Sequence, residues 1–401
     1  MLFCQFFFYN LYLKTIIHIY IYIMENKTFE SLNLNENLVK GLYLYGFNQP
    51  SSIQIKGIMS MNTGKDCLLQ SQSGTGKTAT YLLGVLNRIE ENNTTQAIIL
   101  APTRELCNQV YNVACELSKF TKITIVKAIG GTAIMENKQD LRKSNVIIGT
   151  LGRLHHMINE KTIHLHSLKT FVMDEADDLL SDGIIDKLDH IINKLPIGIQ
   201  TILISATMNV NIFNISKRLL NDPIKILLKN SEVIVDIISQ FYIDCETEEY
   251  KFETLLDLYN IFSASQAIIF CNTIRKVDWL KENLTKQNFT ITCIHSNMTQ
   301  DERNNIIQEF RDGKTRLLLT TDLLARGIDI PTVNLVVNYD LPSSKETYVH
   351  RIGRCGRFGK KGVAISLVKS DDQSDIKTLQ KMKQIYQMDI KEMPNDIEKY
   401  I

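Results

Sequence analysis

A glycine-rich turn, Ser71 to Thr78, follows the apolar run Cys67-Leu68-Leu69 and precedes a helical pattern. Glycines let backbone N–H groups approach an anion, and the N-terminus of the following helix favours negative charge. Lys77 is then expected on the outer phosphates of a nucleotide, and the Thr78 hydroxyl on Mg²⁺. Ser71 replaces the first glycine of the G-x-x-x-x-G-K-[ST] pattern, but the strand-turn-helix context fits it. The turn therefore predicts a phosphate-binding loop whose amides come from Ser73, Gly74, Thr75 and Gly76.

Two carboxylates follow the apolar run Phe171-Val172-Met173. The carboxyl end of a parallel strand points into the crevice where open α/β sheets bind ligands. Asp174 suits Mg²⁺, directly or through water, and Glu175 is placed to orient or deprotonate an attacking water. Taken alone, the carboxylates are equally typical of a solvated acidic turn. With Lys77 upstream on the same sheet, they favour phosphoryl transfer.

Hydroxyl groups end the next apolar run, at Ser205 and Thr207. Small hydroxyl residues are common there as caps and turns, and beside the carboxylates they are also candidates for a relay. Much later in the chain, Arg351, Arg354 and Arg357 follow His350 at spacings of three.

On a helical turn these arginines would share about a third of the circumference and form a positive ridge. A salt-bridged surface is the alternative. Because their half of the chain has no phosphate-binding loop, we expect arginine fingers that reach phosphates bound elsewhere.

Short apolar runs alternate with helical patterns along the chain, which predicts right-handed βαβ units in doubly wound parallel sheets. Around 229–239 the periodicity lapses, which predicts a linker between domains at 25–228 and 240–401. Predicted helices include Glu105 to Phe120 and Asn209 to Leu220. The strands are predicted at 66–70, 97–101, 123–127, 146–149, 171–174 and 201–205, and then at 240–243, 267–271, 290–294, 316–320, 335–337 and 363–368.

Length and composition limit the class of protein. A chain of 401 residues is expected to divide into two domains, and 44% hydrophobic with 22% charged residues is typical of a globular protein. The net charge of +1 means that a nucleic-acid surface must be local. The eight cysteines show no metal-binding spacing and indicate buried free thiols in a reducing, intracellular compartment.

Residues 1–24 differ in composition from the rest, being rich in Phe, Tyr and Ile. The longest charge-free run, Met1 to Leu13, is shorter than the ~20 apolar residues that span a bilayer. We interpret this extension as dispensable, with Met24 as a start; a weak membrane or import signal is the alternative.

Taken together, these motifs resemble those of the DEAD-box RNA helicases of superfamily 2, and most of all the group of translation initiation factor 4A. The resemblance covers about Phe29 to Ile401 and implies two tandem RecA-like domains. Besides the motifs above, it rests on Gly46-Phe47 with Pro50 and Ile53-Gln54, Ala101-Pro102-Thr103-Arg104-Glu105-Leu106, Gly130-Gly131-Thr132, Ala325-Arg326-Gly327-Ile328-Asp329 and Glu392-Met393-Pro394.

The resemblance implies ATP and Mg²⁺ as ligands. It places Phe47 and Gln54 on adenine, Asp329 on the ribose, and Arg354 and Arg357 on the γ-phosphate after the domains close. It implies coupling of the nucleotide site to RNA through Ser205, Thr207, Asp177, His350 and Arg351. The implied RNA contacts, which suit phosphate and ribose but not base edges, are Thr103, Arg104, Gly131, Thr150, Gly152, Arg153, Thr273, Arg275, Thr321, Arg326 and Gly327.

The chain departs from the family's motifs at two places. Leu151 stands where the family has proline, so the phosphate-facing turn loses a fixed φ. His295-Ser296-Asn297 replaces histidine-glycine-aspartate, and Ser296 would strain the turn if that position needs a positive φ.

The resemblance implies a monomeric, cytoplasmic helicase that unwinds short RNA duplexes in translation initiation with a scaffold partner. The alternatives are an ATP-gated RNA clamp like the exon junction ATPase, a nuclear or rRNA-processing helicase, and an NTPase acting on DNA.

Overall fold

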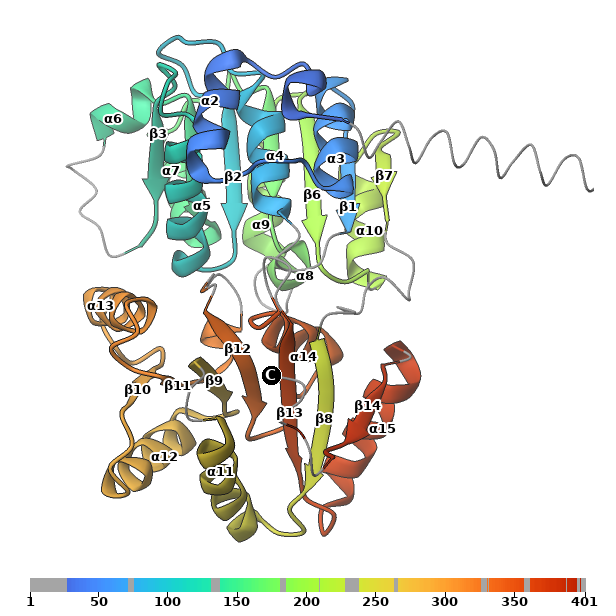
Figure 1. Cartoon of the computed structure of the whole chain (residues 1–401). Helices are drawn as coiled ribbons and strands as arrows, with labels where there is room; N and C mark the ends of the chain where they lie inside the picture. Colours follow the sequence, from blue (N-terminus) through green and yellow to red (C-terminus); the bar gives the residue numbers. More distant parts are fainter. Residues whose placement is uncertain are drawn as a thin grey trace, which may run out of the picture.

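Two α/β units lie one above the other in the computed structural model (Figure 1), which confirms the predicted tandem RecA-like fold. The structure describes residues 27–70, 76–130, 138–180, 185–208, 210–227, 238–262, 266–325, 330, 332–356, 361–386, 388–394 and 397. The N-terminal extension, residues 1–24, and residues 229–237 of the predicted linker lie outside the described residues, and the last two linker residues begin β8. Among the described helices, none is both long enough and apolar enough to span a bilayer.

The first unit has a seven-stranded, all-parallel sheet in the order β3-β4-β2-β5-β6-β1-β7. Its strands are β1 (Cys67–Gln70), β2 (Ala97–Ala101), β3 (Ile125–Ala128), β4 (Val146–Thr150), β5 (Thr170–Met173), β6 (Gln200–Ser205) and β7 (Ile224–Ile226). The helical elements are η1 (Phe29–Leu32), α2 (Glu36–Tyr45), α3 (Ser52–Asn62), α4 (Lys77–Leu86), α5 (Arg104–Leu117), α6 (Lys138–Lys143), α7 (Leu151–Asn159), α8 (Ala176–Leu179), α9 (Ile185–Ile192) and α10 (Val210–Leu219).

The second unit repeats this arrangement, with a parallel sheet in the order β10-β11-β9-β12-β13-β8-β14. Its strands are β8 (Ile238–Asp244), β9 (Gln266–Phe270), β10 (Ile291–Ile294), β11 (Leu317–Thr320), β12 (Val333–Asn338), β13 (Gly362–Val368) and β14 (Ile390–Glu392). The helical elements are α11 (Glu248–Phe262), α12 (Ile274–Lys286), α13 (Gln300–Arg311), η3 (Asp322–Leu324), α14 (Lys345–Ile352) and α15 (Gln373–Tyr386).

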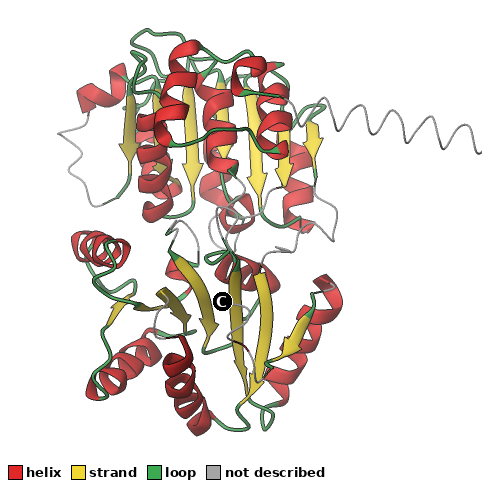
Figure 2. Ribbon diagram, in the orientation of Figure 1, coloured by secondary structure: helices red, strands yellow, loops and turns green. Residues whose placement is uncertain are grey.

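Helices cover both faces of each sheet (Figure 2), so successive strand residues enter different cores. Leu69 packs with α3 and α4, whereas its neighbour Leu68 packs on the opposite face with α10. Ile268 and Ile269 divide in the same way in the second unit. This double burial explains why the strands read as continuous apolar runs and not as alternating patterns.

All twelve predicted strands are present, with ends that differ by up to two residues. Two further strands, β7 and β14, were not predicted; they are edge strands of three residues each. Three residues are too few to show a period, and an edge strand needs no continuous apolar run. The two predicted helices correspond to α5 and α10.

Candidate nucleotide and RNA site

The phosphate-binding turn is described on its helical side only, because Ser73, Gly74 and Thr75 lie outside the described residues. Gly76 caps α4 with a φ of 87°. A Cβ at this position would come within 2.6 Å of Nε2 of Gln54, and the left-handed backbone favours glycine whatever the space. Thr78 lies half-buried in the first turn of α4.

Lys77 points from the start of α4 toward the carboxylates that follow β5. Its Nζ lies 3.6 Å from Oε1 of Glu175, and both side chains are buried. Among the described residues, this Nζ has no hydrogen-bond partner. A buried ammonium with unused donors at a helix N-terminus fits a phosphate group.

Asp174 is fully buried at the end of β5, and its two oxygens accept hydrogen bonds from different groups. The Tyr81 hydroxyl donates to Oδ2 at 2.8 Å, and the Glu175 backbone N–H donates to Oδ1 at 2.9 Å. Burial raises the pKa of Asp174, and the neighbouring Lys77 opposes that shift. An oxygen donor of this kind, with the Thr78 hydroxyl, fits Mg²⁺.

Glu175 has a φ of 46°, a left-handed conformation that costs energy in a residue other than glycine. It precedes α8, and the strained backbone lies at the residue expected to handle the attacking water.

The residues expected at adenine lie before β1, in the loop after α2 and in α3. The Phe47 ring is half-buried and stacks on Tyr45, with 5.7 Å between ring centroids. Gln54 is buried in α3, where its Oε1 accepts the Ser51 backbone N–H at 2.8 Å in a capping box. Its amide nitrogen faces Gly76, so Gln54 connects the predicted adenine end with the phosphate turn.

Four residues expected to couple nucleotide and RNA form one chain of contacts across the two units. The Ser205 hydroxyl donates to the Thr207 carbonyl, and the Thr207 hydroxyl donates to Oδ2 of Asp177 at 2.7 Å. The same oxygen lies 3.1 Å from Nε2 of His350, which belongs to α14 in the second unit. The Asp177 and His350 side chains are fully buried at this contact.

The predicted helical ridge is wrong for the two described arginines, Arg351 and Arg354. The helix α14 ends at Ile352, and Arg354 lies in the following turn, where its N–H donates to the Arg351 carbonyl. Arg351 is fully buried and holds its own unit together, because its guanidinium donates to Asp322, Asn272 and the Asp340 carbonyl.

Arg354 is also buried, and its Nε donates to the His350 carbonyl at 3.1 Å. Arg357 lies outside the described residues, so its expected contact with the γ-phosphate is untested.

Four of the predicted RNA contacts are N-caps of helices that follow the carboxyl ends of strands. The caps come from both units, and the backbone amides at these helix starts are suited to phosphates. In Figure 1 the strands β2 and β6 run toward the second unit. The four caps, for α5, α7, α12 and η3, are Thr103, Thr150, Thr273 and Thr321.

The remaining RNA candidates are described in part. The Arg104 guanidinium packs on Gly130, where a Cβ would meet it at 2.9 Å, and a Cβ on Gly152 would meet nothing within 4 Å. Arg153 and Arg275 lie in the first turns of α7 and α12. Gly131, Arg326 and Gly327 lie outside the described residues, as does the ribose candidate Asp329.

Sequence reasoning missed a second contact between the units. Glu105 lies in the first turn of α5 and is almost fully buried. Its Oε1 accepts from Nη1 of Arg303 at 3.0 Å and from the Gln300 amide at 3.3 Å. Both partners lie on α13, nearly two hundred residues later. The run Thr103-Arg104-Glu105 drew attention to this place, but no local pattern could pair Glu105 with α13.

Neither departure from the family's motifs distorts the backbone. The helix α7 begins at Leu151, which is buried in the first unit's core, with Thr150 as an extended N-cap. Ser296 is not among the described residues with positive φ. Its carbonyl accepts from Nη2 of Arg303 at 3.0 Å, so the strain considered from the sequence is absent at this described position.

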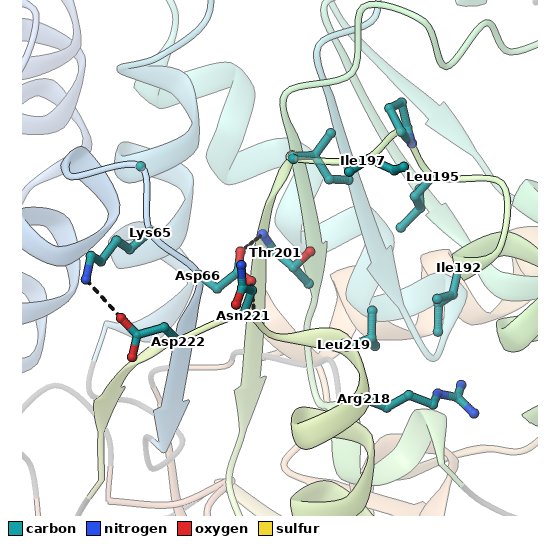
Figure 3. Close-up of a pocket in the computed structure, with 14 residues that line it drawn as sticks. Lys65, Asp66, Ile192, Leu195, Ile197, Thr201, Arg218, Leu219, Asn221 and Asp222 are labelled. Carbon is teal, nitrogen blue, oxygen red and sulfur yellow. Dashed lines mark hydrogen bonds and ion pairs between the residues drawn. The ribbon is translucent and has the colours of Figure 1, made fainter.

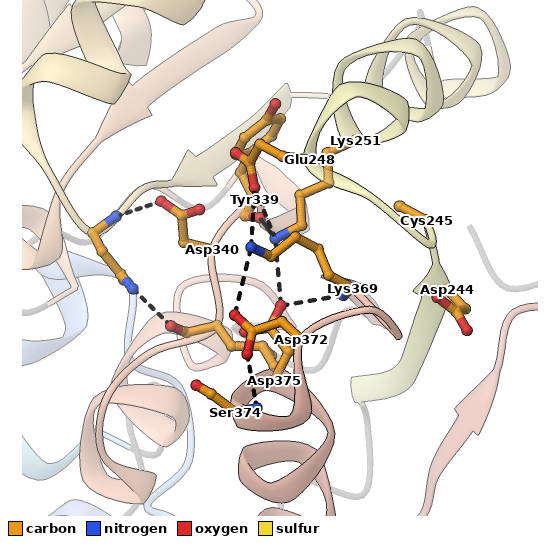
Figure 4. A network of polar contacts seen from close by, with 12 residues as sticks. Asp244, Cys245, Glu248, Lys251, Tyr339, Asp340, Lys369, Asp372, Ser374 and Asp375 are labelled. Atoms are coloured by element: carbon orange, nitrogen blue, oxygen red, sulfur yellow. Dashed lines mark hydrogen bonds and ion pairs between the residues drawn. The ribbon is translucent and has the colours of Figure 1, made fainter.

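The second unit holds a salt-bridge network where the first has the phosphate-binding turn (Figure 4). By sheet order, β8 corresponds to β1, and α11 therefore corresponds to α4. On α11 the buried Lys251 donates to the Tyr339 carbonyl at 3.1 Å and lies 3.6 Å from Asp375. The second unit therefore supplies a carbonyl and a carboxylate to the Lys251 ammonium, whereas the Lys77 ammonium has no hydrogen-bond partner among the described residues.

A pocket of about 590 Å³ lies at the opposite end of the first sheet (Figure 3). It is lined by residues at the amino ends of β1 and β6, such as Asp66 and Thr201. Lys77, Asp174 and Glu175 follow the carboxyl ends of β1 and β5, so this pocket is separate from their site.

Comparisons with known proteins match the motifs. A DEAD/DEAH box helicase family model covers residues 51–215, and a helicase conserved C-terminal domain model covers 250–359. The chain is 44% identical over 373 residues to eukaryotic initiation factor 4A of Caenorhabditis elegans, covering 92% of each chain. It is 46% identical over 371 residues to the ATP-dependent RNA helicase eIF4A of Scheffersomyces stipitis, covering 92% of this chain and 93% of that one.

Solved structures show the same fold, and they differ in how well the whole chain superposes. Dbp5 of S. cerevisiae bound to RNA and ADP BeF3 is 37% identical and matches with a TM-score of 0.87, covering 93% of this chain and 98% of that one. A point variant of the same Dbp5, bound to Nup159, a variant of Gle1, IP6 and ADP, matches with 0.65 at 35% identity, covering 92% and 98%. The arrangement of the two units is therefore closer to that in the Dbp5 complex with RNA and ADP BeF3 than to that in the complex with Nup159, Gle1, IP6 and ADP.

The identities extend over more than nine-tenths of the chain and of its relatives, and the two helicase models match its two halves. The chain belongs to the DEAD-box family of ATP-dependent RNA helicases, which hydrolyse ATP, and within it the chain is close to eIF4A.

Proposed function

We propose that this helicase closes its two units over single-stranded RNA, excludes a duplex, and opens again after ATP hydrolysis. The observation that carries this proposal is the pair of buried contacts between the units, Asp177 with His350 and Glu105 with Arg303. One begins beside the candidate ATP site, and the other begins at an N-terminus expected to bind RNA. ATP and RNA then both stabilise the closed arrangement, so each raises the affinity for the other.

In this proposal Lys77 and the amides of the turn bind the β- and γ-phosphates, and Glu175 orients the attacking water. Asp174 and Thr78 hold Mg²⁺, which would neutralise charge on the phosphates. Arg354 and Arg357 stabilise the transferring phosphate, Phe47 and Gln54 bind adenine, and Asp329 binds the ribose.

RNA lies along the helix N-termini of both units and is held by its phosphates and riboses. Base edges are not read, so binding is neutral to sequence. We further propose a role in translation initiation in the cytoplasm, as a monomer assisted by a scaffold protein. The proposal rests on the likeness to eIF4A.

The test is Glu175→Gln, which keeps the size of the side chain but removes the carboxylate that organises the water. ATP and Mg²⁺ should still bind while hydrolysis stops, so this variant should hold single-stranded RNA far longer than the parent protein. The measurement is the RNA dissociation rate with ATP, for several unrelated sequences. Glu116→Gln, the same exchange on the exposed face of α5, is the matched control and should release RNA like the parent.

A parent protein that holds RNA as long as Glu175→Gln does, without any added partner, would favour an ATP-gated clamp over a helicase. Stimulation of hydrolysis by single-stranded DNA as strongly as by RNA would contradict the RNA assignment.

A further inference from the structure

Three potential metal ligands meet at the edge of the second sheet, where α12 also carries the RNA candidate Arg275 one turn earlier. Cys293 lies on β10, the edge strand, and His295 follows two residues later, just beyond the strand. Residues two apart in extended chain face the same side. Asp278 lies on α12, the helix that packs against β10.

The donor atoms of these residues are already close together. The thiol sulfur, one imidazole nitrogen and one carboxylate oxygen all lie within 4.8 Å of one another. Nε2 of His295 lies 3.3 Å from Oδ1 of Asp278. Tetrahedral Zn²⁺, with bonds of about 2.0–2.3 Å, separates its ligands by roughly 3.3–3.8 Å, so movements of about 1 Å complete the geometry.

The three side chains are buried to different extents, as expected for a metal site that is open to solvent on one side. Cys293 and His295 are buried, and Asp278 is exposed. His295 is nine-tenths buried, and among the described residues its Nδ1 has no hydrogen-bond partner. Three protein ligands with an exposed fourth position are typical of zinc sites that keep a water ligand.

We propose that Asp278, Cys293 and His295 bind a borderline-soft divalent cation, with Zn²⁺ as the best match. One thiolate, one imidazole and one carboxylate are a ligand set that selects Zn²⁺ or Co²⁺ over the harder Mg²⁺. The site is therefore distinct in chemistry and in place from the Mg²⁺ position expected at Asp174.

Lys281 is the charged group that faces this site. Burial raises the pKa of the Cys293 thiol, and the charge and hydrogen bond of Lys281 offset only part of that rise. Because the Lys281 side chain is exposed and flexible, it can turn to solvent when a cation binds.

The site lies at the start of the loop that Arg303 holds. Nη2 and Nε of Arg303 donate to the carbonyls of Ser296 and Met298, directly after His295. Its remaining donor, Nη1, contacts Glu105 of the first unit. A cation on His295 therefore restrains the loop that positions this contact between the units.

The experiment is a titration of the full-length, chelator-treated protein with Co²⁺, followed by absorption. Binding of one Co²⁺ should give a thiolate-to-cobalt band in the near ultraviolet, which Zn²⁺ should abolish by displacement. Cys293→Ser should remove the band, whereas the matched control Cys115→Ser, which changes a half-buried cysteine in the first unit, should keep it.

Asp278→Asn, an exposed change that leaves the packing intact, should weaken Co²⁺ binding at least about tenfold, since even second-shell changes cost that much. Zn²⁺ should also raise the unfolding midpoint of the parent protein but not that of Asp278→Asn. Absence of the band in the parent, or its persistence in Cys293→Ser, would overturn the proposal. Unchanged binding by Asp278→Asn would overturn it equally.

Discussion

Asp174 and Lys77 illustrate how single buried groups prepare the candidate ATP site. Asp174 has both oxygens engaged by donors, one of them the Tyr81 hydroxyl from within α4. Lys77, from the same helix, lies beside Glu175. The helix α4 therefore positions the expected phosphate-binding cation and orients the expected Mg²⁺ ligand.

Tyr81→Phe tests this arrangement at one atom. The change removes only the hydroxyl that donates to Asp174, and a hydrogen bond to a charged group contributes about 1.5–3 kcal/mol. We expect kcat for RNA-stimulated hydrolysis to fall by at least about tenfold. The measurement is steady-state ATPase activity with saturating RNA.

Tyr348→Phe is the matched control, because Tyr348 is equally buried and donates to Gln240 in the second unit. It should lower stability without lowering kcat. Equal losses of kcat in both variants would show that Tyr81 acts through stability alone.

At the scale of elements, the two units use equivalent helices for different purposes. The amino end of α4 carries Gly76 and a lysine with unused donors, whereas α11 carries Lys251, which its own unit satisfies. Glu248, Lys276 and Asp340 extend this network between α11, α12 and the end of β12. In the second unit, salt bridges therefore occupy the place that corresponds to the expected phosphate site of the first unit.

Lys251→Met should destabilise the second unit. The side chain is buried and connects Tyr339 with Asp375, so its removal leaves a partly buried carboxylate without its cation. Breaking a buried ion pair costs roughly 3 kcal/mol. Urea unfolding should show this loss, whereas Lys286→Ala, which breaks an exposed pair with Glu282, should cost less than about 1 kcal/mol. Similar losses in the two variants would contradict a structural role for the network.

Sequence reasoning predicted twelve of the fourteen described strands because these are buried on both faces and therefore read as continuous apolar runs. It found Asp177 and His350 separately, through the family's motifs. It could not predict that Arg351 is buried, since the partners of Arg351 come from three other segments. Glu105 and Arg303 escaped notice for the same reason: a contact between distant helices leaves no local pattern.

At the scale of the whole molecule, two buried contacts between described residues join the units. Glu105 and Arg303 are both largely buried in this arrangement, and separation of the units would return both charges to water. The pair is therefore expected to favour closure without affecting the fold of either unit.

Exchange of the two charges tests this contact. Glu105→Arg should impair RNA-stimulated hydrolysis, because it places two cations together in the closed arrangement. Combining it with Arg303→Glu should restore part of the lost activity, as pair-specific coupling requires. Lys314→Ala, an exposed change just after α13, is the control. Additive losses in the double variant would show that the pair is not a closure contact.

The second contact should carry the coupling between ATP and RNA. His350→Ala leaves Asp177 buried against the second unit without its imidazole partner, which disfavours the closed arrangement only. We expect the factor by which RNA raises ATP affinity to fall toward one. By linkage, the factor by which ATP raises RNA affinity should fall equally. Such coupling factors are typically about 5- to 150-fold, and we expect the variant to fall below that range.

The measurements are equilibrium ATP binding with and without RNA, and RNA binding with and without a non-hydrolysable ATP analogue. Val349→Ala is the matched control, because Val349 precedes His350 on α14 but packs into the second unit's core. It should lower stability and keep the coupling, since it removes no contact with Asp177. If His350→Ala retains the parent's coupling in both directions, closure must depend on contacts other than this pair, with Glu105 and Arg303 as the first to examine.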